Sequence, residues 1–250
     1  MAHEYPETFA RFYDLIYHHL RDSADSGFYL GEIRNTKGRV LEIGTGTGRF
    51  FLNALKEGAD IYGIDISFSM VDILQTKLDK KDLYRVSLQS IVDFNLNMEF
   101  DLIIAPFRVF MHLLEKDDQI KALNNVYRHL GPGGKFIFDV FVPNLSALIN
   151  GISNQIDFDG EYEPGKKVRR IVSTSPDLHN QLINIDFLLE WDEGNETRHQ
   201  HWLTPLRYFF RFELEHLVER SDFRNYKIFG DFQGNELNDK SVEFIVICSK

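Results

Sequence analysis

Val40-Leu41-Glu42-Ile43-Gly44-Thr45-Gly46-Thr47-Gly48 decides the fold, because it joins a short apolar strand to three closely spaced glycines. Apolar residues follow at helical spacing: Phe50, Phe51, Ala54 and Leu55. A glycine-rich turn between a buried strand and a helix lets the backbone approach a ligand closely, and it directs free helical N–H groups at that ligand. We therefore expect a nucleotide-type ligand above this turn.

The spacing of the glycines argues against a nicotinamide dinucleotide as that ligand. A dinucleotide fingerprint has a further glycine three residues after Gly46, where this sequence has Arg49. Asp65 lies 21 residues after Gly44, at the end of the next predicted strand, where a carboxylate accepts hydrogen bonds from ribose hydroxyls. Glu42 adds a second carboxylate, which either orients the loop or meets an ammonium group.

Strands and helices alternate along most of the chain. Strands are predicted at 39–43, 60–65, 83–88, 100–105, 135–142, 226–230 and 242–248, and helices at 6–20, 25–34, 50–58, 67–78, 117–129 and 210–219. This alternation predicts an α/β fold with a doubly wound, mostly parallel sheet and right-handed crossovers. Residues 151–206 instead alternate between apolar and polar positions, which indicates an antiparallel β meander inserted into a single domain of residues 1–250.

Composition and charge restrict the partners of this chain. A formal net charge of −10 argues against binding to a nucleic-acid backbone, and the basic run 166–170 alternates like the solvated face of a strand. The single cysteine, Cys248, excludes an intrachain disulfide and fits a reducing compartment. Charged residues within the first twenty positions argue against a signal peptide or a membrane span. We therefore expect a cytoplasmic monomer or homodimer that binds a small molecule, and neither nucleic acid nor membrane.

A metal site is not expected. His199 and His201 share a strand face if their segment is extended, but no third ligand has an obvious spacing. They are better interpreted as part of a polar pocket wall.

Several motifs resemble those of class I S-adenosylmethionine-dependent methyltransferases. Residues 42–48 and Ile64-Asp65 resemble the first two motifs of that family, 100–107 its fourth-strand motif, and 130–135 its turn before strand five. The inserted meander and the Tyr208-Phe209-Phe210 region resemble the bacterial small-molecule branch, which includes sugar-amine N-methyltransferases. The resemblance implies a seven-stranded sheet and S-adenosylmethionine as the methyl donor, with S-adenosylhomocysteine as product.

The resemblance also implies which residues hold the donor. Gly44 and Gly46 would lie near its methionine part, Asp65 would bind the ribose, and the adenine would lie between Ile66 and Met70, near Ser90 and Ile91. The implied donor site comprises Tyr13, Glu42, Gly44, Thr45, Gly46, Gly48, Asp65, Ile66, Met70, Ser90, Ile91 and Ala105. Helices at about 6–35 would act as a lid over the donor, although Tyr13 and Tyr17 would serve equally as core aromatics.

The acceptor is restricted by the residues that follow the fourth strand. Family members that methylate nucleobases or glutamine amides carry Asn/Asp-Pro-Pro-Tyr/Phe there, whereas this sequence reads Ala105-Pro106-Phe107-Arg108. Without the Asn or Asp side chain that would accept a hydrogen bond from the substrate, a planar amine is disfavoured as the methyl acceptor. A more basic amine, a hydroxyl or an acidic carbon remains possible. Methyl transfer depends chiefly on positioning and desolvation. If a base is used, His112 is the first candidate, because it follows the end of the fourth strand by seven residues and would face the pocket with Arg108, although a partly buried structural histidine fits equally. Tyr13 is the third residue expected to take part in catalysis.

A small-molecule methyltransferase acting on an amine nitrogen by in-line displacement is the function that these features favour. Two alternatives stay open: an NAD(P)-linked oxidoreductase, and a non-catalytic nucleotide-binding module of the same fold.

Overall fold

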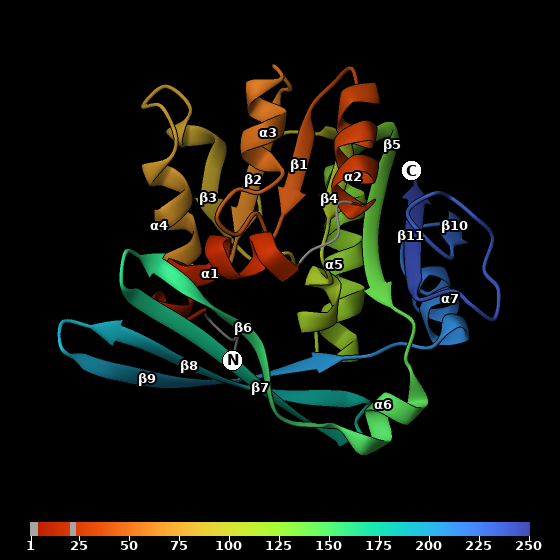
Figure 1. Cartoon of the computed structure of the whole chain (residues 1–250). Helices are drawn as coiled ribbons and strands as arrows, with labels where there is room; N and C mark the ends of the chain where they lie inside the picture. Colours follow the sequence, from red (N-terminus) through yellow and green to blue (C-terminus); the bar gives the residue numbers. More distant parts are fainter. Residues whose placement is uncertain (1–4, 21–23) are drawn as a thin grey trace.

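The computed structural model describes residues 5–20 and 24–250, and its centre is a seven-stranded sheet (Figure 1). The strands are β1 (Val40–Ile43), β2 (Ile61–Asp65), β3 (Val86–Leu88), β4 (Phe100–Ala105), β5 (Leu130–Phe141), β10 (Asn225–Phe229) and β11 (Glu243–Ser249). They lie in the order β10-β11-β5-β4-β1-β2-β3; β11 is antiparallel to both of its neighbours, β10 and β5, and all the other neighbouring pairs are parallel. The winding direction reverses between β4 and β1, so a ligand crevice is expected at their carboxyl ends. The predicted doubly wound, mostly parallel sheet is confirmed.

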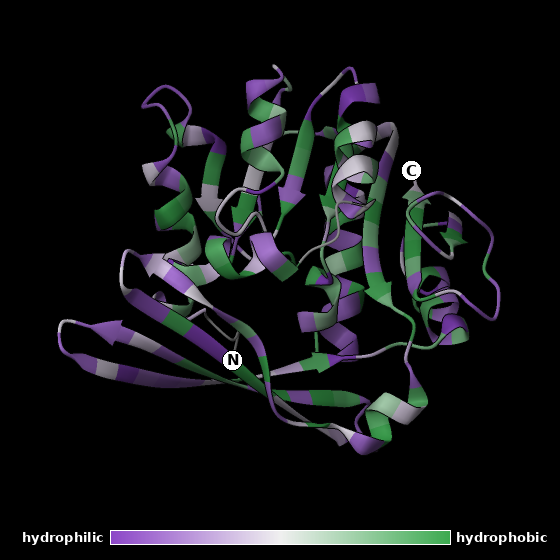
Figure 2. Ribbon diagram, viewed as in Figure 1, coloured by the Kyte–Doolittle hydropathy of each residue, from purple (hydrophilic) through white to green (hydrophobic). Residues whose placement is uncertain are grey.

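Helices cover both faces of this sheet because successive strand residues point to opposite sides. The helices are α2 (Ala24–Asn35), α3 (Phe51–Lys56) and α4 (Phe68–Thr76) on one face, and α5 (Lys116–His129) and α7 (Arg211–Glu219) on the other. Ile104 of β4 packs in the cluster with Phe51 and Leu74, whereas the adjacent Ile103 packs in the cluster with Leu123. Figure 2 shows the resulting apolar colour along the central strands.

A second, antiparallel sheet follows β5 and confirms the predicted inserted meander. Its strands are β6 (Ile152–Glu163), β7 (Lys166–Asp177), β8 (Leu182–Glu193) and β9 (Glu196–Arg207), paired in that order. Helix α1 (Glu7–Leu20) packs on it, with Phe12 and Ile16 in one cluster with Phe187 and Trp202. In Figure 1, α1 lies between this sheet and the carboxyl ends of the central strands.

Three local predictions need correction. The segment 83–88 begins as a 3₁₀ turn, Leu83–Arg85, because the Arg85 N–H bonds to the Asp82 carbonyl at 3.0 Å, and β3 starts only at Val86. Strand β5 begins at Leu130 rather than 135, since Leu130 already pairs with Phe100 before the register shifts. A short helix, α6 (Leu145–Asn150), was not expected, although Asn144 caps it by accepting from the Ala147 N–H at 3.0 Å.

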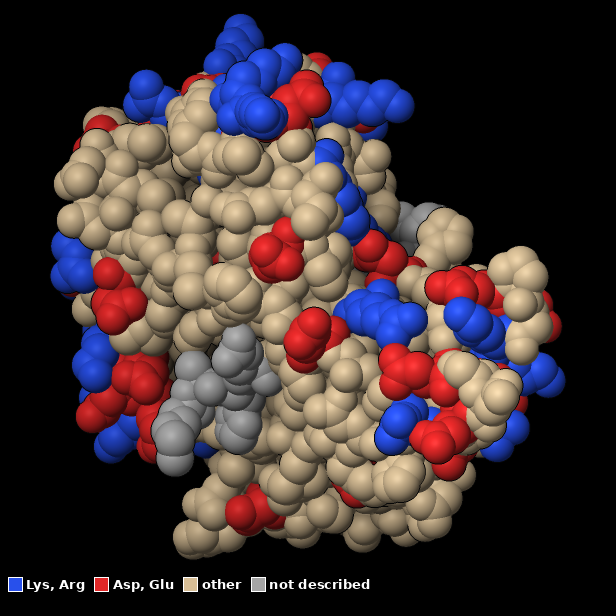
Figure 3. All heavy atoms as spheres, turned by 90° about the vertical axis from the view of Figure 1, so that its left-hand side faces the viewer, with Lys and Arg blue, Asp and Glu red and all other residues tan. Residues whose placement is uncertain are grey.

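The basic run 166–170 is solvated on one side only. Arg169 pairs with Asp159 on the outer face of the second sheet, whereas Arg170 is 5% exposed and pairs with Asp157. The interpretation as a solvated face is therefore wrong for Arg170, which the alternation of β7 turns inward with Val168. Figure 3 shows acidic side chains interspersed with basic ones on the face that it views.

Two further features bear on the sequence-based expectations. Cys248 is buried in β11, and burial raises the pKa of its thiol well above the ordinary range. Among the helices formed by residues 5–20 and 24–250, none is long and apolar enough to cross a membrane.

Candidate active site

The glycine loop closes over the end of strand β2. The N–H groups of Gly44 and Thr45 both donate to the Ile64 carbonyl, at 2.8 and 3.2 Å. Gly44, Gly46 and Gly48 all have positive φ, which other residues rarely adopt. A Cβ at Gly44 would lie 2.4 Å from a methyl group of Val109, whereas one at Gly46 would meet no heavy atom within 4 Å. The loop is therefore packed at its start and open above Gly46.

Asp65, the last residue of β2, ties this loop to helix α4. One carboxylate oxygen accepts from the Gly46 N–H at 2.8 Å, and the other accepts from the Ser67 N–H at 2.8 Å. Burial raises the pKa of Asp65, and the backbone hydrogen bonds from Ser67 and Gly46 oppose that rise. Asp65, the residue predicted to bind the ribose, thus lies beside the open part of the loop and is held by backbone N–H groups on both sides.

Residues expected around the adenine fall into an exposed group and a buried group. Ile66, directly after Asp65, is 45% exposed, whereas Met70 is buried. Ser67 caps α4 by accepting from the Met70 N–H at 3.4 Å. Ser90 is half-buried, and its hydroxyl oxygen accepts from the Val92 N–H at 3.2 Å.

Four other residues of the expected donor site, Glu42, Thr45, Ile91 and Ala105, are buried. Any role of their side chains therefore depends on packing, or on a polar atom that faces the crevice.

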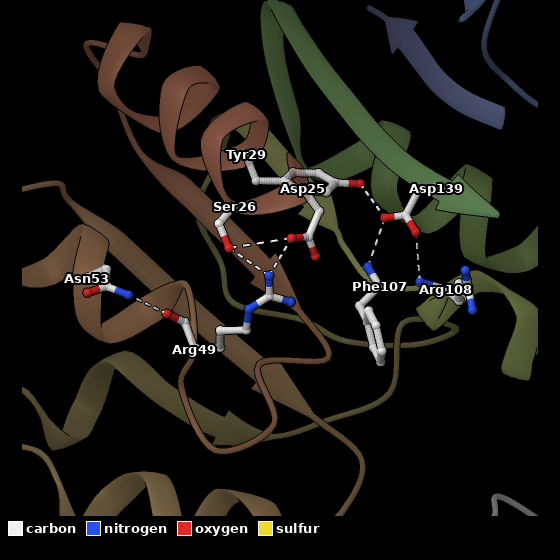
Figure 4. A network of polar contacts seen from close by, with 8 residues as sticks. All are labelled: Asp25, Ser26, Tyr29, Arg49, Asn53, Phe107, Arg108 and Asp139. Atoms are coloured by element: carbon white, nitrogen blue, oxygen red, sulfur yellow. Dashed lines mark hydrogen bonds and ion pairs between the residues drawn. The ribbon is translucent and has the colours of Figure 1, made fainter. Parts of the chain in front are cut away.

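Arg49 is a further candidate for donor binding, which the sequence distinguished only as an arginine where a dinucleotide fingerprint has glycine. Its guanidinium forms an ion pair with Asp25 and donates to the Ser26 hydroxyl at 2.6 Å, both residues of α2. Nη1 of Arg49 is buried and has no hydrogen-bond partner among the described residues. Figure 4 shows this guanidinium between α2 and the glycine loop. A buried cationic N–H without a partner is costly, so this atom indicates an anionic ligand group.

The loop after strand β4 adopts an unusual backbone conformation. Phe107 and Arg108 have φ values of 58° and 65°, in the left-handed region. The carboxylate of Asp139 accepts from both of their N–H groups, at 2.8 and 3.1 Å, and from the Tyr29 hydroxyl at 2.6 Å (Figure 4). Burial is the main cause that raises the pKa of Asp139 to about 6. Burial and the neighbouring Asp139 also raise the pKa of Tyr29, so its hydroxyl stays protonated and donates.

Aromatic rings of helix α1 continue from this loop. The ring of Phe107 meets that of Tyr17 edge to face, with the ring centroids 5.6 Å apart. The ring centroids of Tyr17 and Tyr13 are 4.4 Å apart. Behind them, the Arg170 guanidinium lies 4.8 Å from the Tyr17 ring centroid. We call Tyr13, Tyr17 and Phe107 the aromatic wall.

Comparison with known proteins assigns the family. Residues 17–228 match the model of a methyltransferase domain family. The chain belongs to this family. It is a class I S-adenosylmethionine-dependent methyltransferase, which argues against the NAD(P)-linked oxidoreductase and the non-catalytic module.

Individual relatives of this methyltransferase cover nearly its whole length. Cypemycin N-terminal methyltransferase from a Streptomyces species is 24% identical over 98% of this chain and 97% of that protein. Glycine/sarcosine N-methyltransferase from Parasynechococcus marenigrum is 28% identical over 92% of this chain and 79% of that protein. The fold is similar to that of an S-adenosylmethionine-dependent methyltransferase from Clostridium acetobutylicum, with a TM-score of 0.76, 19% identity and 97% of each chain covered. It is also similar to DesVI from Streptomyces venezuelae, with a TM-score of 0.75, 18% identity, and 95% of this chain and 97% of that chain covered.

The crevice of the methyltransferase fits the charged part of its donor. Space is open above Gly46, and Nη1 of Arg49 offers a cationic donor beside the glycine loop. The buried hydroxyl of Thr45 also has no hydrogen-bond partner among the described residues. A ligand that carries both a carboxylate and ribose hydroxyls would satisfy these groups together with Asp65.

The two catalytic candidates other than Tyr13 are Arg108 and His112. Arg108 directs its guanidinium at Glu243 of β11, at 2.9 Å, rather than along the crevice. His112 is exposed at the end of the 3₁₀ helix Val109–His112. Their roles stay predictions.

The predicted pocket histidine of the second sheet lies on its outer face. His201 contacts Asp186 at 3.0 Å and is exposed. Among residues 5–20 and 24–250, no group of three His, Cys, Asp or Glu side chains is placed to hold a metal.

Proposed function

We propose that this enzyme methylates the amine nitrogen of a small molecule. The observation that carries the proposal is the aromatic wall, which stands beside the end of β4, where the Asn/Asp-Pro-Pro motif of planar-amine methylases is absent. The names of two relatives, a cypemycin N-terminal methyltransferase and a glycine/sarcosine N-methyltransferase, agree with a basic amine. Solved neighbours also include sugar N-methyltransferases of the same fold.

The donor would be held by the glycine loop, Asp65 and Arg49. Asp65 has acceptor positions left for ribose hydroxyls after its two backbone bonds, and Arg49 would bind the methionine carboxylate through Nη1. We retain the other donor residues as part of this proposal: Tyr13, Glu42, Gly44, Thr45, Gly48, Ile66, Met70, Ser90, Ile91 and Ala105. Bound there, the donor supplies a methyl group on a positively charged sulfur.

Residues of the chain then favour transfer to a neutral amine. The amine would accept the methyl group through its nitrogen lone pair, with the donor's sulfur as leaving group, so the nitrogen would gain positive charge. The faces of Tyr13, Tyr17 and Phe107 stabilise that charge without needing a fixed anion. The excess proton of the product leaves to water or to His112, the candidate base.

Helices at 6–35 would act as the lid over the donor. The Asp14 carboxylate accepts from Lys77, directly after α4, at 2.6 Å and from the Thr47 hydroxyl of the glycine loop. These contacts tie α1 to the donor side, so closing α1 would exclude water from the reacting atoms. Residues 21–23 of this expected lid lie outside the described residues.

The test follows labelled methyl from the donor into paired acceptors. We would offer glycine, sarcosine and an alanine-headed peptide, beside the analogues in which a hydroxyl replaces the amine: glycolic acid for the first two, and a lactate-headed peptide for the third. Mass spectrometry should find the label in at least one amine and in none of the hydroxyl analogues. Transfer to a hydroxyl analogue alone, or to none of the compounds, would refute the amine assignment.

A further inference from the structure

Asp139 binds two consecutive backbone N–H groups of the loop after β4. It is 3% exposed near the end of β5, and the loop that it holds is more than thirty residues earlier in sequence. Successive N–H groups that converge on one carboxylate form an anion nest, which favours the backbone conformation that creates it. The third partner, Tyr29 of α2, fixes the carboxylate from the other side.

The conformation of this loop needs such support. Left-handed backbone is unfavourable for a residue that has a Cβ, and Phe107 and Arg108 both adopt it. The two hydrogen bonds from the loop to the Asp139 carboxylate are charge-assisted, so they are stronger than neutral ones and offset that cost. An asparagine at 139 would offer one acceptor oxygen and would turn an amide N–H donor toward another donor.

The loop conformation decides where its two side chains go. Phe107 turns toward Tyr17 of α1, and Arg108 turns toward Glu243 of β11. In ordinary right-handed or extended backbone, these side chains would leave the loop in other directions. Asp139 therefore acts on the aromatic wall through the backbone of Phe107 rather than through its ring.

We propose that Asp139 and Tyr29 are positioning residues for methyl transfer, because they hold Phe107 in the aromatic wall beside the reacting nitrogen. The inference rests on the proposed function in one respect, namely that the wall faces the acceptor. Charged groups around the carboxylate are Glu243 and Arg108, which pair with each other, and Asp25 one turn before Tyr29. None of them accepts a hydrogen bond from the loop N–H groups that Asp139 holds.

The experiment combines Asp139→Asn with Arg108→Gly in a double-mutant cycle. Glycine adopts left-handed backbone without a Cβ penalty, so the loop of Arg108→Gly should need Asp139 less. Tyr29→Phe is the milder variant, since it leaves both backbone bonds to Asp139 in place. The measurements are kcat and KM with the best of the three amines above, S-adenosylhomocysteine affinity by calorimetry, and the ring resonances of Tyr17 by NMR.

We expect Asp139→Asn to lower kcat at least tenfold in the wild-type background, with S-adenosylhomocysteine affinity within twofold. In the Arg108→Gly background the same substitution should cost less than threefold. The Tyr17 ring resonances, which sense the ring of Phe107, should shift in Asp139→Asn and return toward their original positions in the double variant. Tyr29→Phe should show a smaller change of the same kind.

Three results would overturn the proposal. One is an equal loss of kcat in both backgrounds, and another is unchanged Tyr17 resonances in Asp139→Asn. The third is a lower melting temperature with unaltered kcat at a temperature where the variant is folded, which would make Asp139 purely structural. If wild-type protein methylates none of the amines, the amine assignment fails, and the Tyr17 resonances alone then decide whether Asp139 positions the loop.

Discussion

Replacing Arg49 by methionine should weaken binding of the donor product S-adenosylhomocysteine selectively through its carboxylate. Methionine keeps much of the aliphatic length and removes Nη1, the buried N–H that lacks a partner among the described residues. A hydrogen bond between charged groups contributes about 1.5–3 kcal/mol, so affinity should fall roughly 10- to 150-fold. Decarboxylated S-adenosylhomocysteine, which keeps the adenosine and the amino group, should bind wild type and variant within about threefold of each other.

The comparison of two ligands separates recognition from folding. Arg49 also pairs with Asp25, so its loss leaves a mostly buried carboxylate without its cation and lowers stability. That loss would weaken both ligands alike. Arg49→Lys, which keeps the charge without the planar fork, should fall between wild type and Arg49→Met. Equal weakening of both ligands in calorimetry would refute the carboxylate role and leave Arg49 as a structural partner of α2.

Three further outcomes are expected. Asp65→Ala should weaken S-adenosylhomocysteine by on the order of 1–3 kcal/mol in calorimetry, and unchanged affinity would mean that the ribose lies elsewhere. Because the pKa of Asp139 rises from 3.8 to about 6 on folding, ionisation opposes folding. Wild type should therefore lose about 3 kcal/mol of unfolding free energy relative to Asp139→Asn between about pH 4 and pH 6, as measured by urea titration. A difference that does not vary with pH would contradict this. His112→Ala should reduce turnover while sparing donor binding, and a pH–rate profile identical to that of wild type would exclude His112 as a base.

Local sequence rules were sufficient to predict that the glycine loop and Asp65 lie together. A strand, a glycine turn and a helix lie within twenty residues, and the carboxylate of Asp65 follows at the end of the next strand, so spacing alone brought the loop and Asp65 together. The cap at Ser67 was predictable for the same reason, since it depends only on the residues three positions away.

Long-range contacts account for what the sequence could not provide. Tyr29 and Asp139 lie 110 positions apart, and no periodic pattern links them. The left-handed backbone at Phe107 and Arg108 carries no glycine signal, because the carboxylate of another strand supports it. Arg49 could have been noticed as an arginine in the place of a glycine, but its unpartnered nitrogen depends on how α2 docks. Arg170 was misread because the whole basic run was assigned to one solvated face, whereas the alternation of the strand turns Arg170 to the opposite, buried face.

The burial of the single cysteine makes this protein convenient for spectroscopy. Cys248 has no exposed surface, and its thiol resists ionisation, so maleimide or spin-label reagents should leave the native protein unmodified. A cysteine introduced at an exposed position of α1, such as Glu7, would then be the sole labelled site. Paired with a second label at exposed Asp72 of α4, it would report the distance between α1 and α4 with and without ligand, so that movement of the lid could be measured as a change in that distance.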